Sequence, residues 1–352
     1  MSVNLFDSSG CPLDRQRFTW KELVQNPLSK LDDDAFTRVR AILMNGVELD
    51  AVRTKQAMLR MNGELRVPVA QLEPDPYLAQ AYRYALLEHF DHLYRFSALL
   101  DRLEGKDANN ITQGYTDIAP ARPTTEQHRS PENDLIEPYG MDAALSTKLH
   151  ALTLTGGEYQ THDYYMTIGP MFADPLARQL YAEVASIQSQ YITHYSSMID
   201  PHENPMEKML LAEAAEVWNY QACAEQESNP RIRAIWERLL DYEMGHMQVV
   251  LHLFKDLERR DPAQLLGDGT LPPRIRFASQ RDFVRRVIAA ESSLRKDGTE
   301  FVSEEAEAPA SIGWREHLNA EGSPSMAVSG GWHWTPGTEL NDASDSDRST
   351  PA

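Results

Sequence analysis

Residues 204–257 read NPMEKMLLAEAAEVWNYQACAEQESNPRIRAIWERLLDYEMGHMQVVLHLFKDL, and this stretch decides the fold. It contains two short motifs, Glu213-Ala-Ala-Glu216 and Glu243-Met-Gly-His246. In each motif the two polar side chains stand three residues apart, which places them on one face of a helix. The 30 residues from Glu213 to Glu243 suit two antiparallel helices joined by a tight turn. The stretch therefore predicts a helical hairpin that carries carboxylates and an imidazole.

The face around the second motif is otherwise apolar. At helical spacing it holds Trp236, Leu239, Glu243, His246, Val250 and Leu253. Burying an isolated carboxylate is costly unless it is paired or bound to a metal ion. We therefore expect Glu243 and His246 to ligate metal, and the alternative is an internally hydrogen-bonded polar core. The first motif alone is a weak indicator, since Glu-x-x-Glu is common on solvated helices.

The starts of the helices are marked by a capping residue followed by proline. Such pairs occur at Asp75-Pro76, Asp174-Pro175, Asn204-Pro205 and Asn229-Pro230. We predict helices over 34–61, 76–104, 142–167, 175–200, 205–228 and 230–257, and a shorter one near 279–295. No segment shows the alternation typical of a strand. The sequence predicts an all-α fold, a bundle of about six helices.

These helices divide the chain into six segments. They are an N-terminal extension (1–33), an N-terminal helical hairpin (34–104), a long loop (105–140), a four-helix core (141–258), short C-terminal helices (259–295) and an acidic tail (296–352). The loop is long enough to be either a crossover along the bundle or a mobile loop. The tail is polar and rich in Ser and Gly, so we expect it to be mostly disordered. Its residues Trp314, Trp332 and Trp334 could dock on the core or on a partner, but we expect them to be weakly ordered.

Composition argues against several classes of protein. The net charge is −19, whereas nucleic-acid binding needs a basic face, so we expect no nucleic-acid partner. No stretch approaches the roughly 18 apolar residues of a membrane span, and the N-terminus lacks the pattern of a signal peptide. The only cysteines, Cys11 and Cys223, argue against a disulfide framework. We expect a cytoplasmic protein without a membrane partner.

The spacing of the hairpin motifs repeats upstream. Glu158 lies in the predicted helix 142–167, and 30 residues later Gln188 begins a pair with Tyr191 at i, i+3. Glu183 and His194 lie nearby on the same predicted helix as this pair. Helices 142–257 therefore present polar groups in two successive hairpins.

With these motifs, residues 142–257 resemble a ferritin-like, rubrerythrin-type domain of the di-metal carboxylate superfamily. The stretches GGEYQTHDYYM, LYAEVASIQSQYITHYSSMIDP and SNPRIRAIWERLLDYEMGHMQ are similar to uncharacterised ferritin-like proteins. The resemblance implies a ferritin-like bundle that binds two irons, or manganese, through Glu158, Glu213, Glu216, Glu243 and His246. Where that family normally has Glu-x-x-His, this chain has Gln188 and Tyr191, and Glu183 or His194 would have to compensate.

The earlier helices offer an alternative set of ligands. Glu48 lies in the predicted helix 34–61, and Glu88 and His92 share an otherwise apolar stripe of the next helix. Natural ferritin-like bundles have two helices, a long connection and then two more helices. The predicted helices 34–61 and 76–104, the loop 105–140 and the next two helices follow this order, which favours the alternative set. It leaves His246 and its motif outside the site, however, and we prefer the set that contains the intact motif.

The resemblance implies a di-iron or di-manganese oxidase, oxygenase or peroxidase that acts on O2 or peroxide. No Cys-x-x-Cys pairs mark a rubredoxin-like module, so electrons would come from a separate donor protein, and a homodimer is expected by the same resemblance. The alternative is a degenerate ferritin-like scaffold or interaction protein with little or no metal. In that case the acidic, Trp-containing tail would be the functional part.

Overall fold

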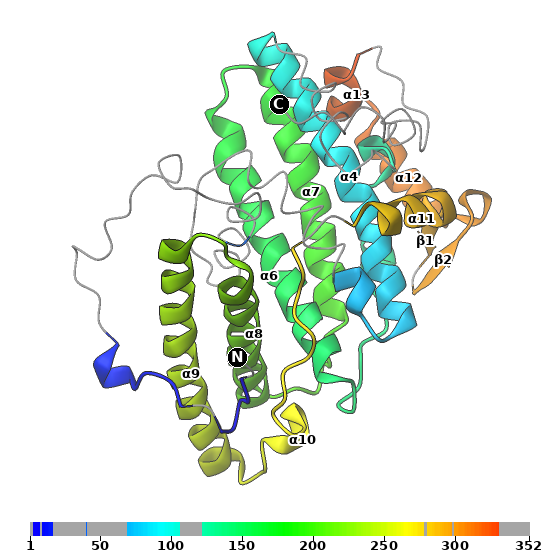
Figure 1. Cartoon of the computed structure of the whole chain (residues 1–352). Helices are drawn as coiled ribbons and strands as arrows, with labels where there is room; N and C mark the ends of the chain where they lie inside the picture. Colours follow the sequence, from blue (N-terminus) through cyan, green and yellow to red (C-terminus); the bar gives the residue numbers. More distant parts are fainter. Residues whose placement is uncertain are drawn as a thin grey trace.

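The computed structural model describes residues 3–7, 9–16, 40, 69–105, 122–277, 280–297 and 299–330. This part of the chain is helical apart from one two-stranded hairpin (Figure 1), which confirms the all-α prediction. The elements are η1 (Leu13–Arg15), α4 (Pro76–Glu104), η3 (Thr124–Glu126), η4 (Pro131–Asp134), α6 (Leu145–Ile168), η5 (Gly169–Met171), α7 (Pro175–Ser197), α8 (Pro205–Gln226), α9 (Pro230–Glu258), α10 (Ala263–Leu266), α11 (Arg281–Glu291), β1 (Arg295–Asp297), β2 (Glu300–Val302), η6 (Glu304–Ala306), α12 (Pro309–Leu318) and α13 (Pro324–Val328). No described helix is long and apolar enough to cross a membrane.

All four predicted cap–proline pairs begin helices. The side chains of Asp75, Asp174, Asn204 and Asn229 each accept two backbone N–H groups of the first turn. Such a cap contributes about 1 kcal/mol, because it satisfies donors that have no partner inside the helix. The helix predicted from residue 142 begins instead at Leu145, where no side chain caps it.

Two antiparallel helical hairpins, α6–α7 and α8–α9, form the centre of the molecule (Figure 1). They meet where α6 packs against α8, and there Asn219 Nδ2 donates a hydrogen bond of 2.9 Å to Thr153 Oγ1. On the other side of the α6–α7 hairpin, α4 packs against α7 and reaches α6 through the rings of Phe96 and Tyr165, 5.1 Å apart. The interior of the molecule is thus shared between the α8–α9 hairpin and a layer made of α4, α6 and α7.

The described part of the predicted loop 105–140 packs closely on α4 and α7. Arg122 and Arg129 are buried in it, and Arg122 Nη1 donates to the carbonyl oxygen of Tyr84 at 3.1 Å. Gln190 of α7 holds the same segment, since its Oε1 accepts the backbone N–H of Arg129 at 2.8 Å. This segment therefore supplies polar groups to the interior of the α4–α6–α7 layer.

The prediction of disorder from residue 296 onward is wrong for residues 296–297 and 299–330. β1 and β2 pair antiparallel, and Lys296 is buried with its Nζ donating to the carbonyl oxygens of Asn133 and Leu135. The sequence looked disordered because the segment has few apolar residues, but polar contacts with the rest of the chain hold it in place.

Other predicted segments lie outside the described residues. They are residues 331–352 of the tail, which include Trp332 and Trp334, and the predicted helix 34–61 apart from Arg40. Arg40 forms a buried ion pair with Glu227, with Nη2 2.8 Å from Oε2.

Candidate metal centre

The two motifs of the α8–α9 hairpin come together in the structure. Glu213 of α8 and Glu243 and His246 of α9 each offer one ligand atom, and these three atoms all lie within 4.8 Å of one another. Nδ1 of His246 is 2.7 Å from Oε2 of Glu243 and 4.0 Å from Oε2 of Glu213. These three residues therefore form the group that the motif spacing predicts.

The predicted apolar stripe of α9 is partly wrong. Leu253 is 41% exposed and the side chain of His246 is 35% exposed, whereas Glu243 is buried. The buried face instead includes Met247 and Phe254, which follow Glu243 at helical spacing. The carboxylate of Glu243 therefore lies in the core of the hairpin, and the imidazole of His246 lies at its edge.

The N-terminal segment covers His246. Gln16 Nε2 lies 2.9 Å from the carbonyl oxygen of Cys11 and 3.0 Å from that of Tyr242. Because carbonyl oxygens only accept hydrogen bonds, these contacts fix the orientation of the amide. Its Oε1 then accepts a hydrogen bond from the N–H at Nε2 of His246, 2.9 Å away. This bond places the proton of the neutral imidazole on Nε2 and directs the lone pair of Nδ1 toward the two carboxylates.

Gly245, inside the second motif, makes this contact with the N-terminal segment possible. A Cβ at position 245 would lie 1.9 Å from the carbonyl oxygen of Cys11, and a Cβ at Gly10 would lie 2.2 Å from the backbone nitrogen of Gly245. The backbone of the N-terminal segment thus touches that of α9, and Cys11 N–H donates to the Asp241 carbonyl oxygen at 2.7 Å. Figure 1 shows this segment, in blue, crossing α9.

This group has the composition of a transition-metal site. It offers one imidazole nitrogen and two carboxylate oxygens, a donor set that suits Fe²⁺, Mn²⁺ or Zn²⁺. The amide of Gln16 forms a hydrogen bond with the ring nitrogen that faces away from the carboxylates. Metal-bound histidines usually have such a hydrogen-bond partner. The residues present therefore fit a divalent metal ion.

The five-residue ligand set predicted from the resemblance does not come together as one group. Glu216 is half-buried and is not part of the cluster found among the described residues. Glu158 is fully buried, and its Oε2 lies 3.4 Å from Nε2 of His89 on α4. Glu158 therefore faces α4, because α6 turns this side toward the α4–α6–α7 layer.

The alternative ligand set is also divided. Glu48 lies outside the described residues. Both carboxylate oxygens of Glu88 are 3.0 Å from Nη1 of Arg129, and Nη1 of Arg122 is 3.5 Å from Oε1. Glu88 is thus the counter-ion of two buried arginines, which corrects its prediction as a metal ligand. His92 is buried beside it and forms a hydrogen bond with Gln127.

Neither Glu183 nor His194 compensates for Gln188 and Tyr191. Burial raises the pKa of Glu183, but nearby His128, 3.9 Å away, and hydrogen bonds from Ser323 and Ser325 outweigh this effect and leave the pKa below its usual value. Burial, with help from the charges of Lys296 and Arg129, lowers the pKa of His194 well below its usual value. These two side chains face the C-terminal segment and its surroundings.

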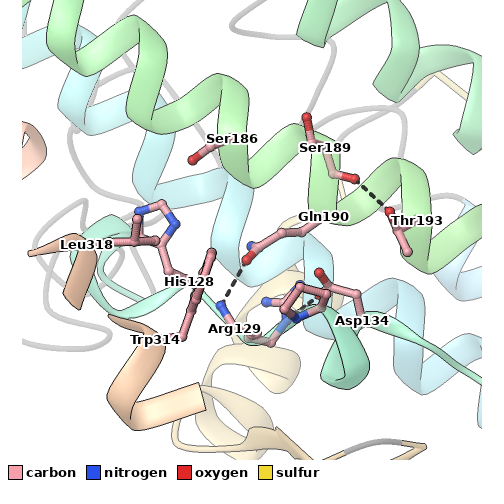
Figure 2. A pocket seen from close by; sticks show the side chains of 10 residues that line it. His128, Arg129, Asp134, Ser186, Ser189, Gln190, Thr193, Trp314 and Leu318 are labelled. Atoms are coloured by element: carbon pink, nitrogen blue, oxygen red, sulfur yellow. Dashed lines mark hydrogen bonds and ion pairs between the residues drawn. The ribbon is translucent and has the colours of Figure 1, made fainter. Parts of the chain in front are cut away.

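A second feature is a cavity of about 260 Å³ between the segment 128–134, α7 and α12. Figure 2 shows His128 and Trp314 at one end of it, and Arg129, Gln190 and Asp134 at the other. The expectation that the tail tryptophans are weakly ordered is wrong for Trp314, whose indole packs at this cavity and is 42% exposed.

Sequence patterns missed His89 and Gln16. The helix pattern selected Glu88 and His92 by their apolar neighbours, although His89, on the same turn, is the residue that meets Glu158. Gln16 lies in a short segment without periodicity, so no signal in the sequence connects it to His246.

Comparisons with protein-family models, with curated proteins and with solved structures found no match for this chain. The function is therefore argued from the geometry of its own residues.

Proposed function

We propose that this chain is a metal-binding oxidoreductase of the ferritin-like carboxylate type, in which Glu213, Glu243 and His246 hold iron or manganese. The observation that carries the proposal is the contact of 2.7 Å between Nδ1 of His246 and Oε2 of Glu243. Because Gln16 accepts a hydrogen bond from Nε2–H and so keeps the proton on that nitrogen, the neutral ring and the carboxylate present two acceptors to each other. Two acceptors at this distance need positive charge between them, which either a proton or a metal ion provides.

A second carboxylate favours the metal ion. A single proton would neutralise one negative charge, but Glu213 brings a second carboxylate to within 4.0 Å of the same nitrogen. A divalent ion offsets both charges, and burial strengthens its attraction to the carboxylates. The side chain of Glu243 is only 7% exposed, and a carboxylate this buried is stable when it is paired or bound to a metal ion.

Each residue has a separate role in this proposal. Glu213 and Glu243 supply charge, His246 supplies nitrogen, and Gln16 keeps the imidazole in the tautomer that binds. Bound iron or manganese would supply electrons for the reduction of O2 or peroxide. The partly exposed edge at His246 leaves a route for a small oxidant, and a separate protein would return the electrons.

The redox part of the proposal rests on the resemblance of residues 142–257 to ferritin-like domains that the sequence motifs suggest. The di-metal form would require further ligands, and Glu216 is the next carboxylate along the same motif of α8. The three residues that meet in the structure supply ligands for one metal ion.

Metal analysis with O2 uptake tests the proposal. The full chain is purified under reducing conditions with Fe²⁺, its iron is counted, and O2 consumption is followed after a reductant is added. We expect at least one iron per chain and O2 uptake, both lost in a Glu243→Gln, His246→Gln variant. The matched control is Glu237→Gln, His252→Gln, which makes the same changes at exposed positions of α9.

A metal-free scaffold is the second candidate function. It is favoured by Gln188 and Tyr191, which stand where the resemblance would require metal ligands. Iron at background level in the wild-type chain would support the scaffold and overturn the oxidoreductase. Equal iron content in the two double variants would contradict the assignment of the metal site to Glu243 and His246.

A further inference from the structure

The cavity between the segment 128–134, α7 and α12 is separate from the candidate metal centre, because none of the residues that line it belongs to α8, α9 or the N-terminal segment. Its volume is about 260 Å³. At about 30 Å³ for each molecule of liquid water, this is room for roughly eight water molecules. Pockets for drug-sized ligands are larger, at about 300–1,000 Å³. The cavity can therefore hold one small molecule.

One wall of the cavity is apolar. Trp314 and Leu318 stand four residues apart on α12, so both lie on the same face of this helix. Both line the cavity, and they are 42% and 44% exposed. A ligand that covers them removes apolar surface from water, which favours binding. The ligand should therefore present an apolar face, and an aromatic ring suits the indole best.

Most polar groups of the cavity already have partners inside the protein. The hydroxyl groups of Ser186 and Thr193 donate to backbone carbonyl oxygens of α7, at 2.7 and 3.2 Å. The amide of Gln190 accepts the backbone N–H of Arg129 at 2.8 Å and donates to the carbonyl oxygen of Gln127 at 3.2 Å. A sugar, with several hydroxyl groups, would therefore find too few hydrogen-bond partners here.

The charges at the cavity are also balanced. Nε of Arg129 lies 2.9 Å from Oδ1 of Asp134, and Nη1 of Arg129 lies 3.0 Å from both carboxylate oxygens of Glu88. Arg122 offsets the second of these carboxylates, since its Nη1 is 3.5 Å from Oε1 of Glu88. A charged ligand would find no counter-charge here and would lose hydration on entering. The ligand is therefore expected to be neutral.

The imidazole of His128 is the exception among the polar groups. His128 lines the cavity and is 4% exposed, and its ring has no hydrogen-bond partner within 3.5 Å among the described residues. Oε1 of Glu183 lies 3.9 Å from its Nε2 and accepts the hydroxyl group of Ser323 at 2.7 Å. A buried polar group without a partner is costly, so a ligand that supplies one gains affinity. Figure 2 shows the ring of His128 at the same end of the cavity as Trp314.

We propose that this cavity binds a small neutral aromatic alcohol of the phenol class. The ring of the ligand lies against the indole of Trp314, and its hydroxyl group forms a hydrogen bond with the imidazole of His128. A hydroxyl group both donates and accepts, so it can pair with either nitrogen of a neutral imidazole. A phenolic hydroxyl group is neutral at pH 7, because its pKa is about 10.

Two fluorinated probes of nearly equal shape test the role of the hydroxyl group. 4-Fluorophenol and 4-fluorotoluene differ only in the exchange of OH for CH3, and fluorine NMR titration of the full-length chain gives the dissociation constant of each. We expect 4-fluorophenol to bind roughly fivefold more tightly, or more, because it alone can form the hydrogen bond. No binding of 4-fluorophenol, or equal binding of the two probes, would overturn the proposal.

A pair of variants locates the bound probe. Trp314→Ala should weaken the binding of 4-fluorophenol by roughly fivefold or more, because the ring loses its aromatic contact. The matched control is Tyr159→Ala, which removes a 45% exposed aromatic side chain of α6 outside the cavity and should leave binding unchanged. Both positions are partly exposed, so neither change should disturb the fold. Equal binding in the two variants would place the probe elsewhere and overturn the proposal.

His128→Leu tests the hydrogen bond itself. This variant should bind the two probes within about twofold of each other, with the fold checked by circular dichroism. Because the substitution is buried, the comparison of Trp314→Ala with Tyr159→Ala gives an answer that does not depend on it. A folded His128→Leu variant that prefers 4-fluorophenol as strongly as the wild type would contradict the pairing of the hydroxyl group with His128.

Discussion

The amide oxygen of Gln16 lies 2.9 Å from Nε2 of His246, so a residue of the N-terminal segment fixes the tautomer of a histidine 230 positions later. Gln127 has the same relationship to His92, at 2.7 Å. Both glutamines donate through Nε2 to two backbone carbonyls, which prevents their amides from turning. The same arrangement of hydrogen bonds therefore fixes the imidazoles of His246 and His92.

Replacing Gln16 with leucine should weaken metal binding at Glu213, Glu243 and His246. Loss of such an outer hydrogen bond typically lowers metal affinity by about 10- to 100-fold. Calorimetric titration with Mn²⁺ measures the change. The matched control is Gln248→Leu, which removes another bond to the N-terminal segment, from Nε2 to the carbonyl oxygen of Leu5, at 3.1 Å. An equal loss of Mn²⁺ affinity in both variants would show that metal binding depends on docking of the N-terminal segment and does not depend on the tautomer of His246.

Gly245→Ala should detach the N-terminal segment from α9. The new Cβ would lie 1.9 Å from the carbonyl oxygen of Cys11, which is too close for any contact. Hydrogen exchange should show faster exchange of the Cys11 amide, which donates to Asp241 in the intact protein. Gly313→Ala in α12 is the control, since no atom lies within 4 Å of its added Cβ. The Gly313→Ala change should stabilise its helix by up to about 1 kcal/mol. If the Cys11 amide still exchanged slowly in Gly245→Ala, the contact between the N-terminal segment and α9 would be contradicted.

Glu88→Gln separates the role of a counter-ion from that of a ligand. The substitution removes the carboxylate that pairs with the buried guanidinium groups of Arg129 and Arg122. It should lower the free energy of unfolding by about 3 kcal/mol or more. Urea unfolding measures this, and metal content should not change. Glu291→Gln, which breaks a less buried pair with Arg83, should cost less than about 1 kcal/mol. Loss of metal from a stable Glu88→Gln protein would restore Glu88 as a ligand.

Lys296 should make the protein more stable as the pH rises above 7. Burial, helped by the charge of Arg129, lowers the pKa of Lys296 to about 7, while its usual value is 10.5. Between these two values the unfolded chain binds a proton that the folded chain does not. Stability therefore falls as the pH drops toward 7 and rises by up to about 1.4 kcal/mol per pH unit above it. Urea unfolding at pH 7.5, 8.25 and 9 should show this rise in the wild type and a smaller one in Lys296→Met, and parallel curves would contradict it.

The helices were predictable because their signals are local. Asp75, Asp174, Asn204 and Asn229 cap the helices that they precede in sequence, and the cap needs no distant partner. The meeting of Glu213 with His246 was predictable for a similar reason, because a tight turn joins the two helices.

What the sequence could not predict depends on segments far apart in the chain. Gln16 reaches His246 and Gln127 reaches His92 from segments without helical periodicity. Glu158 was assigned to the wrong group because the side of α6 that meets α4 is decided by packing. Lys296 looked like part of a disordered tail, although its side-chain amine forms hydrogen bonds with carbonyl oxygens that no sequence pattern marks.

Anomalous X-ray scattering from Mn²⁺ in crystals of the full chain shows whether Glu213, Glu243 and His246 bind a metal ion together. We expect a peak within bonding distance of Oε2 of Glu213, Oε2 of Glu243 and Nδ1 of His246, with Gln16 still hydrogen-bonded to the other ring nitrogen. A map with no peak there, in which His246 and Glu243 keep their direct contact at saturating Mn²⁺, would contradict it.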